Sequence, residues 1–141
     1  MLLAISGAMF SITAMAVSEA MAKNLAPCPS SPNCVLSDAT DSLHHVPHFA
    51  INLPVDEAWR LVREAVNEMP RTKVVETTGN YLHAECTSMI FRFVDDLEFE
   101  LRVEGIIAVR SASRTGRRDF GVNRRRVEQL REILRAKGVI K

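Results

Sequence analysis

The chain has 141 residues, of which 47% are hydrophobic and 25% are charged. This length and composition fit one globular domain that buries a core of its own. Lys and Arg number 18 against 17 Asp and Glu, and a net charge of only +1 argues against a nucleic-acid-binding protein and against a general attraction to anionic membranes.

The charges are distributed unevenly along the chain. Residues 92–104 contain five acidic and two basic residues, whereas residues 110–137 contain ten basic and three acidic residues. Opposite charges that are separated in this way can form a binding surface, or they can pair with each other in the fold.

The chain begins with an apolar stretch, LLAISGAMFSITAMAV, at residues 2–17. It is short for a membrane span, which needs about 18 to 20 apolar residues. Small residues two apart at 14–16 and 20–22 match the pattern that precedes a signal-peptidase cut, although no Lys or Arg precedes Leu2. We predict that residues 1–22 are a signal peptide or membrane-proximal leader, the alternatives being an uncleaved anchor and a helix of the folded body.

Residues 23–47 are rich in Pro, Ser, Asn and Asp without periodicity, and they predict an extended or looped arm. Cys28 and Cys34 lie within it. A lipid-attachment site would need a small residue where Pro27 stands, and a metal site would need a ligand spacing that His44, His45 and His48 do not provide. Export favours a Cys28–Cys34 disulfide, which would stabilise the fold by about 2 kcal/mol.

The elements that follow are predicted in chain order. Residues 48–53 alternate weakly and predict a strand. Pro54 opens a helix with Asp56 and Glu57 in its first turn, and this helix ends at Met69-Pro70. Its predicted buried stripe consists of Trp59, Val62, Ala65, Val66 and Met69.

Strand-like runs occupy residues 72–78, 81–88, 89–94, 95–103 and 105–113. Cys86 alternates with Leu82 and Ala84, which predicts a buried thiol. Glu104-Gly105 is interpreted as a two-residue hairpin turn, which would place Leu97 opposite Ala112 and Asp95 opposite Arg114.

The last helix is predicted from about Asn123 to Lys137, and Gly138 ends it. Its expected stripe consists of Val127, Leu130, Ile133 and Leu134. The order β-α-β-β-β-β-α predicts an α+β fold in which a four- to five-stranded antiparallel sheet carries two helices packed on one face, with a helix-grip-like outline. Residues 48–141 would form this single domain, behind the disulfide-clasped arm at 23–47.

The segment RSASRTGRRDFGVNRRR, residues 110–126, is the densest polar stretch. Its arginines, together with backbone amides at the start of the last helix, could receive a phosphate or a carboxylate. Alternatively, Arg110 and Arg114 pair with Asp95, Asp96 or Glu98. Phe120 is the only aromatic residue in the segment, which argues against nucleic acid as a partner.

The acidic strand offers an acid–base pair or a hard-metal site through Asp95, Asp96 and Glu98. Adjacent strand residues point to opposite faces, so Asp95 and Asp96 are not expected to share a proton or an ion. We therefore assign no metal and no catalytic residue. No nucleotide-binding or nucleophile motif appears, and no cofactor is expected.

Several segments resemble the domain-of-unknown-function family 1499 over roughly residues 26–134: PCPSSPNCVLSDA, AWRLVREAV, PRTKVVE, YLHAECTS, FRFVDDLEFEL and VRSASRTGRRDFGVNRRRVEQLR. The resemblance implies a family without an established activity, often found beside export signals or membrane segments in bacteria and in the plastid lumen of plants. This chain departs from the expected pattern with Arg117-Arg118 in place of a Tyr-Ser-like pair and with Cys86 in place of an aromatic residue.

We expect an exported, non-enzymatic protein in the bacterial periplasm, at a membrane facing the periplasm, or in an equivalent organelle lumen. Its partner would be a small anionic ligand or a membrane or envelope protein, and residues 2–17 would hold it at a membrane if the leader stays uncleaved. The candidate surface consists of Asp95, Asp96, Glu98, Arg110, Ser111, Ser113, Arg114, Asp119, Asn123 and Arg124.

Two alternatives remain open. One is a hydrolase or isomerase that uses Asp95 or Asp96 with Arg110 or Arg114 as the oxyanion partner. The other is a purely structural accessory domain. An enzyme needs an acid and a base that converge in a pocket, whereas acids that are all paired with arginines would favour the structural interpretation.

Overall fold

The computed structural model describes residues 25–141, which form one antiparallel sheet and two helices. The predicted leader and the first two residues of the arm lie outside the described residues. The elements in chain order are β1 (Cys34–Leu36), β2 (Phe49–Ala50), α1 (Val55–Glu68), β3 (Thr72–Thr77), β4 (Tyr81–Thr87), β5 (Val94–Arg102), β6 (Ile106–Ser113) and α2 (Val122–Ala136).

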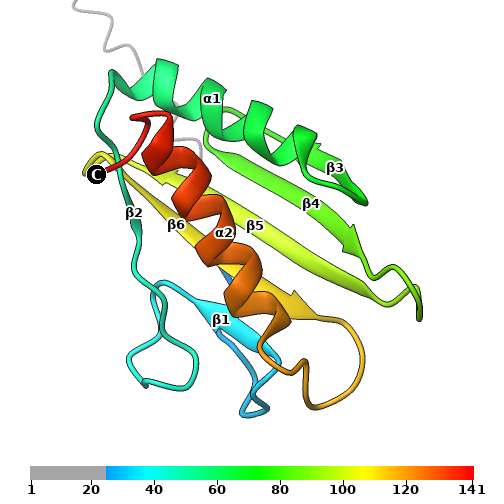
Figure 1. Ribbon diagram of the computed structural model, residues 1–141. Coiled ribbons are helices and arrows are strands. Elements are labelled where there is room, and N and C mark those ends of the chain that lie inside the picture. The colour runs from blue at the N-terminus through cyan, green and yellow to red at the C-terminus, as the bar shows by residue number, and fades with distance from the viewer. Residues whose placement is uncertain (1–24) are drawn as a thin grey trace, which may run out of the picture.

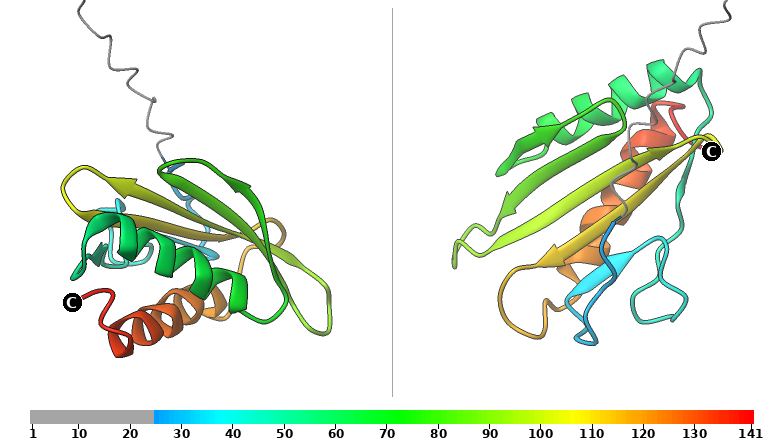
Figure 2. Two further views of the ribbon diagram at one scale, coloured as in Figure 1. Left: turned by 90° about the horizontal axis from the view of Figure 1, so that it is seen from above. Right: turned by 180° about the vertical axis from the view of Figure 1, so that it is seen from behind.

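The sheet has the strand order β1-β6-β5-β4-β3, and β2 also pairs with β6. Both helices cover one face of the sheet, and the other face carries no helix (Figures 1 and 2). The predicted α+β class, the antiparallel pairing and the placement of the two helices on one face are therefore confirmed. Neither α1 nor α2 has the length and apolarity that crossing a bilayer requires.

The arm contributes a strand that the sequence did not predict. β1 pairs with β6, so that Cys34 lies opposite Ala112 and Leu36 lies opposite Arg110. A three-residue strand is too short to show alternation, and its partner lies more than 70 positions later in the chain. The arm is thereby fixed along one edge of the sheet.

The predicted strand at residues 89–94 is wrong. Only Val94 joins the sheet, and the preceding residues form the loop between β4 and β5. The amide of Phe93 donates to Oγ of Ser88 at 2.9 Å, and Arg92 adopts a left-handed φ of 58° that an extended strand cannot contain. The apolar residues of this run therefore point to solvent instead of into a core.

The predicted register of the β5–β6 hairpin is wrong by one residue. Leu97 lies opposite Ser111 and Asp95 lies opposite Ser113. The turn between Arg102 and Ile106 has three residues, and its last residue, Gly105, has a φ of 76°. A left-handed glycine is typical of a three-residue hairpin loop. This register places Glu98 directly opposite Arg110.

The core lies between the sheet and the two helices. Among its fully buried side chains are Phe49, Val62, Leu97, Phe99 and Leu130. The predicted stripe of α1 is confirmed at Trp59, Val62, Ala65 and Val66, while Met69 is partly buried. Cys86 is a buried free thiol as predicted, and burial raises the pKa of its thiol.

The predicted stripe of α2 is confirmed at Val127, Leu130 and Leu134 but is wrong at Ile133, which is 45% exposed. Arg131 is buried instead, with 3% of its surface exposed. Its guanidinium donates to the carbonyls of Pro47 at 2.6 Å and His48 at 3.1 Å, and it lies 4.6 Å above the ring of Phe49. These contacts satisfy the buried charge and join α2 to the arm.

Candidate functional site

The predicted surface is divided between the two faces of the sheet. Successive residues of β5 alternate, so Asp95 points toward α2 while Asp96 and Glu98 lie on the face without helices. Along β6, Ser111 shares the helix side with Asp95, and Arg110 shares the open face with Glu98. As predicted, Asp95 and Asp96 do not form a carboxylate pair.

On the open face, Arg114 binds Asp96 through two hydrogen bonds. Its Nε donates to Oδ2 at 2.9 Å and its Nη2 donates to Oδ1 at 2.7 Å. Glu85 lies 3.2 Å from the same Nη2, and Nε2 of His83 lies 2.7 Å from Asp96. The Arg114 guanidinium lowers the pKa of the Asp96 carboxyl, so this acid is held as a carboxylate.

Glu98 on the same face is bound from two sides. Arg110 Nη1 donates to Oε2 at 3.1 Å, and the hydroxyl of Tyr81 donates to Oε1 at 2.5 Å. Burial and the bond to this carboxylate raise the pKa of Tyr81. The predicted pairing of Arg110 and Arg114 with acids of β5 is therefore confirmed. These acids are already neutralised by basic partners, which leaves no free acid–base pair on this part of the open face.

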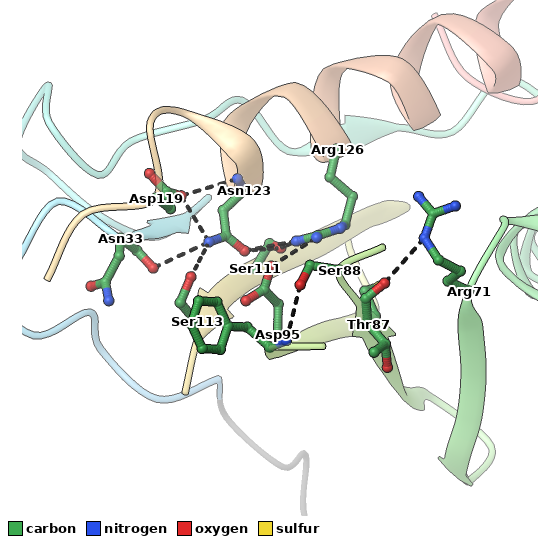
Figure 3. Close-up of polar contacts among 12 residues, drawn as sticks. Asn33, Arg71, Thr87, Ser88, Asp95, Ser111, Ser113, Asp119, Asn123 and Arg126 are labelled. Carbon is green, nitrogen blue, oxygen red and sulfur yellow. Dashed lines mark hydrogen bonds and ion pairs between the residues drawn. The ribbon is translucent and has the colours of Figure 1, made fainter. Parts of the chain in front are cut away.

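On the helix side, Arg126 of α2 reaches down to β5 and β6 (Figure 3). Its Nη2 donates to Oδ2 of Asp95 at 2.8 Å. Its Nη1 donates to Oγ of Ser111 at 3.1 Å and to Oδ1 of Asn123 at 2.9 Å. Arg126 is absent from the predicted surface, although it lies three residues after Asn123, on the buried stripe that continues to Leu130.

Asn123 forms the centre of this buried network (Figure 3). It accepts a hydrogen bond from the hydroxyl of Ser111 at 2.6 Å. Its amide donates to Oγ of Ser113 at 2.9 Å, to Oδ2 of Asp119 at 2.8 Å and to the carbonyl of Asn33 at 3.3 Å. The network therefore joins β6, the start of α2 and the disulfide loop, and it is satisfied internally.

Asp119 occupies the start of α2. Its carboxylate accepts hydrogen bonds from the backbone amides of Gly121 at 2.9 Å and Asn123 at 3.0 Å. Partial burial opposes its ionisation, but the amide and side chain of Asn123 and the amide of Gly121 outweigh this effect and lower its pKa. Because these two amides already donate hydrogen bonds to Asp119, they are not available for the anion that was expected to bind at the helix start.

A disulfide joins Cys28 to Cys34 as predicted, with 5.7 Å between their Cα atoms. The loop that it closes faces the loop after β6 across a cleft of about 880 Å³ that Arg117 and Arg118 help to line. Arg124 also borders this cleft, but its guanidinium donates to the carbonyls of Leu43 at 2.9 Å and His45 at 2.8 Å. Arg124 therefore fixes the arm.

A second cleft, of about 360 Å³, lies between α2 and the adjacent ends of β3 and β4. We call it the arginine cleft because Arg71, Arg125 and Arg126 line it. Cys86, Thr87 and Ser88 contribute to the lining on the side of β4, and the apolar part of the wall consists of Met69, Met89, Val122, Leu130 and Ile133. Guanidinium groups beside apolar walls are suited to ligands that combine an anionic group with an apolar part.

Neither Arg71 nor Arg125 belongs to the candidate surface predicted from the sequence. Arg71 directly follows the proline that ends α1 and has a left-handed φ of 52°, and such strained non-glycine residues tend to occur at functional sites. Arg125 lies in the predicted arginine segment. Its position in the first turn of α2 places it in the lining of this cleft. Arg71 lies near α2 only because the chain after α1 enters β3 beside that helix, and no local sequence pattern predicts this placement.

Within residues 25–141, no group of three or more His, Cys, Asp or Glu side chains is arranged to hold a metal ion. The histidines of the arm have other partners. His44 bonds to Asp41 at 2.8 Å and to the Ser31 carbonyl at 2.9 Å, and His48 bonds to Asp38 at 2.9 Å. These contacts place the histidines in the packing of the arm.

Comparison with known proteins gives one assignment. The chain matches no curated protein. The family described as "Protein of unknown function (DUF1499)" matches residues 24–134, which is most of the chain and includes the residues that line both clefts. The chain therefore belongs to the DUF1499 family.

Proposed function

We propose that this protein is an extracytoplasmic binding module whose arginine cleft takes a ligand with an anionic head group and an apolar part. The observation that carries the proposal is the lining of this cleft, which combines three guanidinium groups with apolar side chains and contains no acidic residue among those that the structure describes. Electrostatic attraction would select the anionic head, and the apolar wall would favour an attached hydrocarbon group.

Two of the three arginines have hydrogen-bonding capacity to spare. Arg71 donates from Nε to the Thr87 carbonyl at 3.2 Å, and Arg125 donates from Nη1 to the Phe120 carbonyl at 2.7 Å. Neither forms an ion pair with any residue of the described chain. Arg126, in contrast, is neutralised by Asp95. Arg71 and Arg125 would therefore provide the charge that a phosphate or carboxylate needs.

The backbone helps to hold the available arginines in place before any ligand binds. Arg125 lies in the first turn of α2, where a Cβ on Gly121 would lie 3.2 Å from its Nη1. Glycine at position 121 thus allows the guanidinium to pack closely against the helix start. A preorganised side chain loses less conformational entropy on binding, which favours affinity.

The ion pairs made by the acids of β5 favour a binding function over a catalytic one. Asp95, Asp96 and Glu98 each pair with an arginine, and neither Asp96 nor Glu98 lines the arginine cleft. A hydrolase or isomerase would instead need an acid or base that is free to exchange a proton with its substrate. We therefore propose the arginine cleft, and not the acidic strand, as the working surface.

An exported location agrees with the disulfide, because such bonds persist in oxidising compartments such as the periplasm. The uncharged stretch at residues 2–17 adds a sequence pattern typical of export. We propose that the domain works in the bacterial periplasm or an equivalent lumen.

The ligand class can be tested by calorimetric titration with octyl phosphate, using inorganic phosphate and octanol as matched probes. We expect octyl phosphate to bind more tightly than either probe. Arg71→Gln and Arg125→Gln should each weaken its binding by about tenfold, whereas Arg60→Gln, which removes an exposed charge on α1, should leave it unchanged. Absence of octyl phosphate binding, or equal binding by all variants, would refute the proposal.

A further inference from the structure

A second feature lies beside the arginine cleft at the same end of the molecule. The loop between β4 and β5 exposes four large apolar side chains, which we call the apolar tip. Ile90 is 80% exposed and Phe91 is 73% exposed, and the tip is completed by Met89 at 68% and Phe93 at 54%. Exposed apolar residues grouped in this way mark a contact surface, whereas scattered ones do not.

The tip has a defined local structure. The rings of Phe91 and Phe93 stack with 5.6 Å between their centroids. Ser88 accepts the amide of Phe93, which closes the base of the loop, and the left-handed Arg92 lies between the two stacked phenylalanines in sequence. The four side chains are therefore presented together at the end of an ordered hairpin.

A third exposed aromatic residue, outside the apolar tip, lies at the same end of the sheet. Phe120 is 86% exposed and belongs to the loop between β6 and α2. Figures 1 and 2 show that this loop and the β4–β5 loop both leave the sheet at this end, while the β5–β6 turn lies at the opposite end. The apolar tip and Phe120 thus project from one end of the molecule.

Among the described residues, the charged side chains that remain unpaired at this end are positive, because the acids here already have partners. Glu85 and Asp96 pair with Arg114, Asp95 pairs with Arg126, and Asp119 is bound by backbone amides. Five arginines at this end make no ion pair with any residue that the structure describes: Arg71, Arg92, Arg117, Arg118 and Arg125. The unpaired positive charges accompany the exposed apolar side chains.

We propose that this end of the domain docks on an anionic phospholipid bilayer, with the apolar tip inserted among the acyl chains and the arginines at the head groups. Each Lys or Arg at an anionic membrane surface adds to the attraction, and burial of apolar side chains adds to it further. Met89, Arg71 and Arg125 also line the arginine cleft. Ile90 and Phe91 do not line it, so substitutions at these two positions test docking without altering that cleft.

The shape of the surface favours a bilayer over a protein partner. A stable protein interface buries about 800 Å² on each partner and relies on close shape complementarity. Here the apolar residues lie in two loops that project from one end of the sheet (Figures 1 and 2), which leaves little continuous area for a rigid partner. A fluid bilayer adapts to such a projection, and basic side chains around an apolar centre match its head groups and acyl chains.

Insertion can be measured on the full chain with a tryptophan reporter at the tip. Phe91→Trp places the reporter in the proposed inserted region, and Val103→Trp places it at the fully exposed turn on the opposite end. Trp59 is buried and gives the same background in both variants. With vesicles of brominated phosphatidylglycerol, we expect strong quenching of the reporter at position 91 and little quenching at position 103. Vesicles of brominated phosphatidylcholine should quench the reporter at position 91 much less.

A binding measurement provides a second test. Ile90→Ser combined with Phe91→Ser should lower partition of the full chain into phosphatidylglycerol vesicles by at least about tenfold, because two large apolar side chains are removed from the contact. Val103→Ser is the matched control and should have no effect. The leader is present in every variant, so a difference between variants reports the tip.

Two results would overturn the proposal. One is equal quenching at positions 91 and 103. The other is vesicle partition that is the same for the serine variant and the wild type, which would place any membrane contact elsewhere in the chain. Because Ile90 and Phe91 lie outside the arginine cleft, the serine variant should still bind octyl phosphate, and either of these outcomes would leave the proposed ligand of the cleft untouched.

Discussion

Arg126 of α2 and Asp95 of β5 form an ion pair of 2.8 Å between Nη2 and Oδ2, and their side chains are only 14% and 10% exposed. The pair fixes the start of α2 over the sheet and engages Oδ2 of Asp95, one of the two acids that the sequence offered as catalytic candidates. It also separates the arginines of the cleft into one neutralised group, Arg126, and two available groups, Arg71 and Arg125.

Removal of the acid from this pair should destabilise the fold strongly. Asp95→Asn leaves the Arg126 charge without its counter-ion, and we expect the free energy of unfolding to fall by about 3 kcal/mol. Chemical denaturation measures the change. Glu64→Gln, which breaks the exposed pair with Arg60, should cost less than about 0.5 kcal/mol. Equal effects of the two substitutions would contradict a structural role for Asp95.

Asn123→Ala tests the buried network at the start of α2. Asn123 has no exposed surface, and its loss would leave the hydroxyls of Ser111 and Ser113 without a shared partner. Because unsatisfied buried polar groups are costly, we expect a loss of about 2 kcal/mol in unfolding free energy. Asn67→Ala on the exposed face of α1 is the control and should have little effect. If both alanine variants unfold at the same denaturant concentration, the network contributes nothing measurable.

Reduction of the Cys28–Cys34 disulfide should lower the free energy of unfolding by about 2 kcal/mol, as the chain-entropy model gives for a short loop. Denaturation curves with and without a reductant measure this difference. Cys86 is the internal control, because this buried thiol is free in both conditions. An unchanged midpoint would show that the hydrogen bonds of β1 alone hold the arm.

The pairing of Asp38 with Arg102 predicts a loss of stability in acid. Two hydrogen bonds from the Arg102 guanidinium lower the pKa of Asp38 from its ordinary value to about 2. Because the pKa is lower in the folded state than in the unfolded state, the stabilisation is complete above the ordinary pKa and is lost as the pH falls toward 2. Solvent screening should limit the loss to about 1 kcal/mol.

Urea denaturation at a series of pH values measures this effect. In Asp38→Asn the corresponding part of the acid dependence should disappear, and at neutral pH the variant should be less stable than the wild type. Wild-type and variant curves that run parallel down to pH 2 would show that another carboxylate controls the acid transition.

Export can be tested by intact-mass measurement of the protein recovered from the bacterial periplasm. We expect a mass that lacks the residues up to one of the two small-x-small sites, at 14–16 or 20–22, and that is lower by two hydrogens for the disulfide. A product that retains Met1 and carries free thiols at Cys28 and Cys34 would contradict both parts of this prediction.

Local periodicity allowed a large part of the fold to be predicted. The two helices and most of the strands could be located because an amphipathic element repeats its apolar residues within a few positions, as at Trp59 and Val62 or at Leu97 and Phe99. The apolar run at residues 89–94 misled the same reasoning. Its residues have the composition of a strand, but the left-handed backbone at Arg92 turns them into a solvent-exposed loop.

The candidate site was predicted less completely, because its contacts join distant parts of the chain. Alternation along β5 correctly separated Asp95 from Asp96, and the pairing of Arg110 and Arg114 with acids was also anticipated. The contribution of Arg126 and the position of Arg71 beside α2 could not be derived, because both depend on how the helices cross the sheet.

The family, the α+β class, the two helices and the disulfide partners could be predicted from the amino-acid sequence alone, since each depends on local patterns or on a pairing with few alternatives. The folded structure was needed to show that Arg126 is neutralised whereas Arg71 and Arg125 remain available. A shift of one residue in the β5–β6 register changes every cross-strand partner, and the pair of Asp38 with Arg102 spans 64 positions. Such long-range contacts follow from packing of the whole chain, which no local pattern encodes.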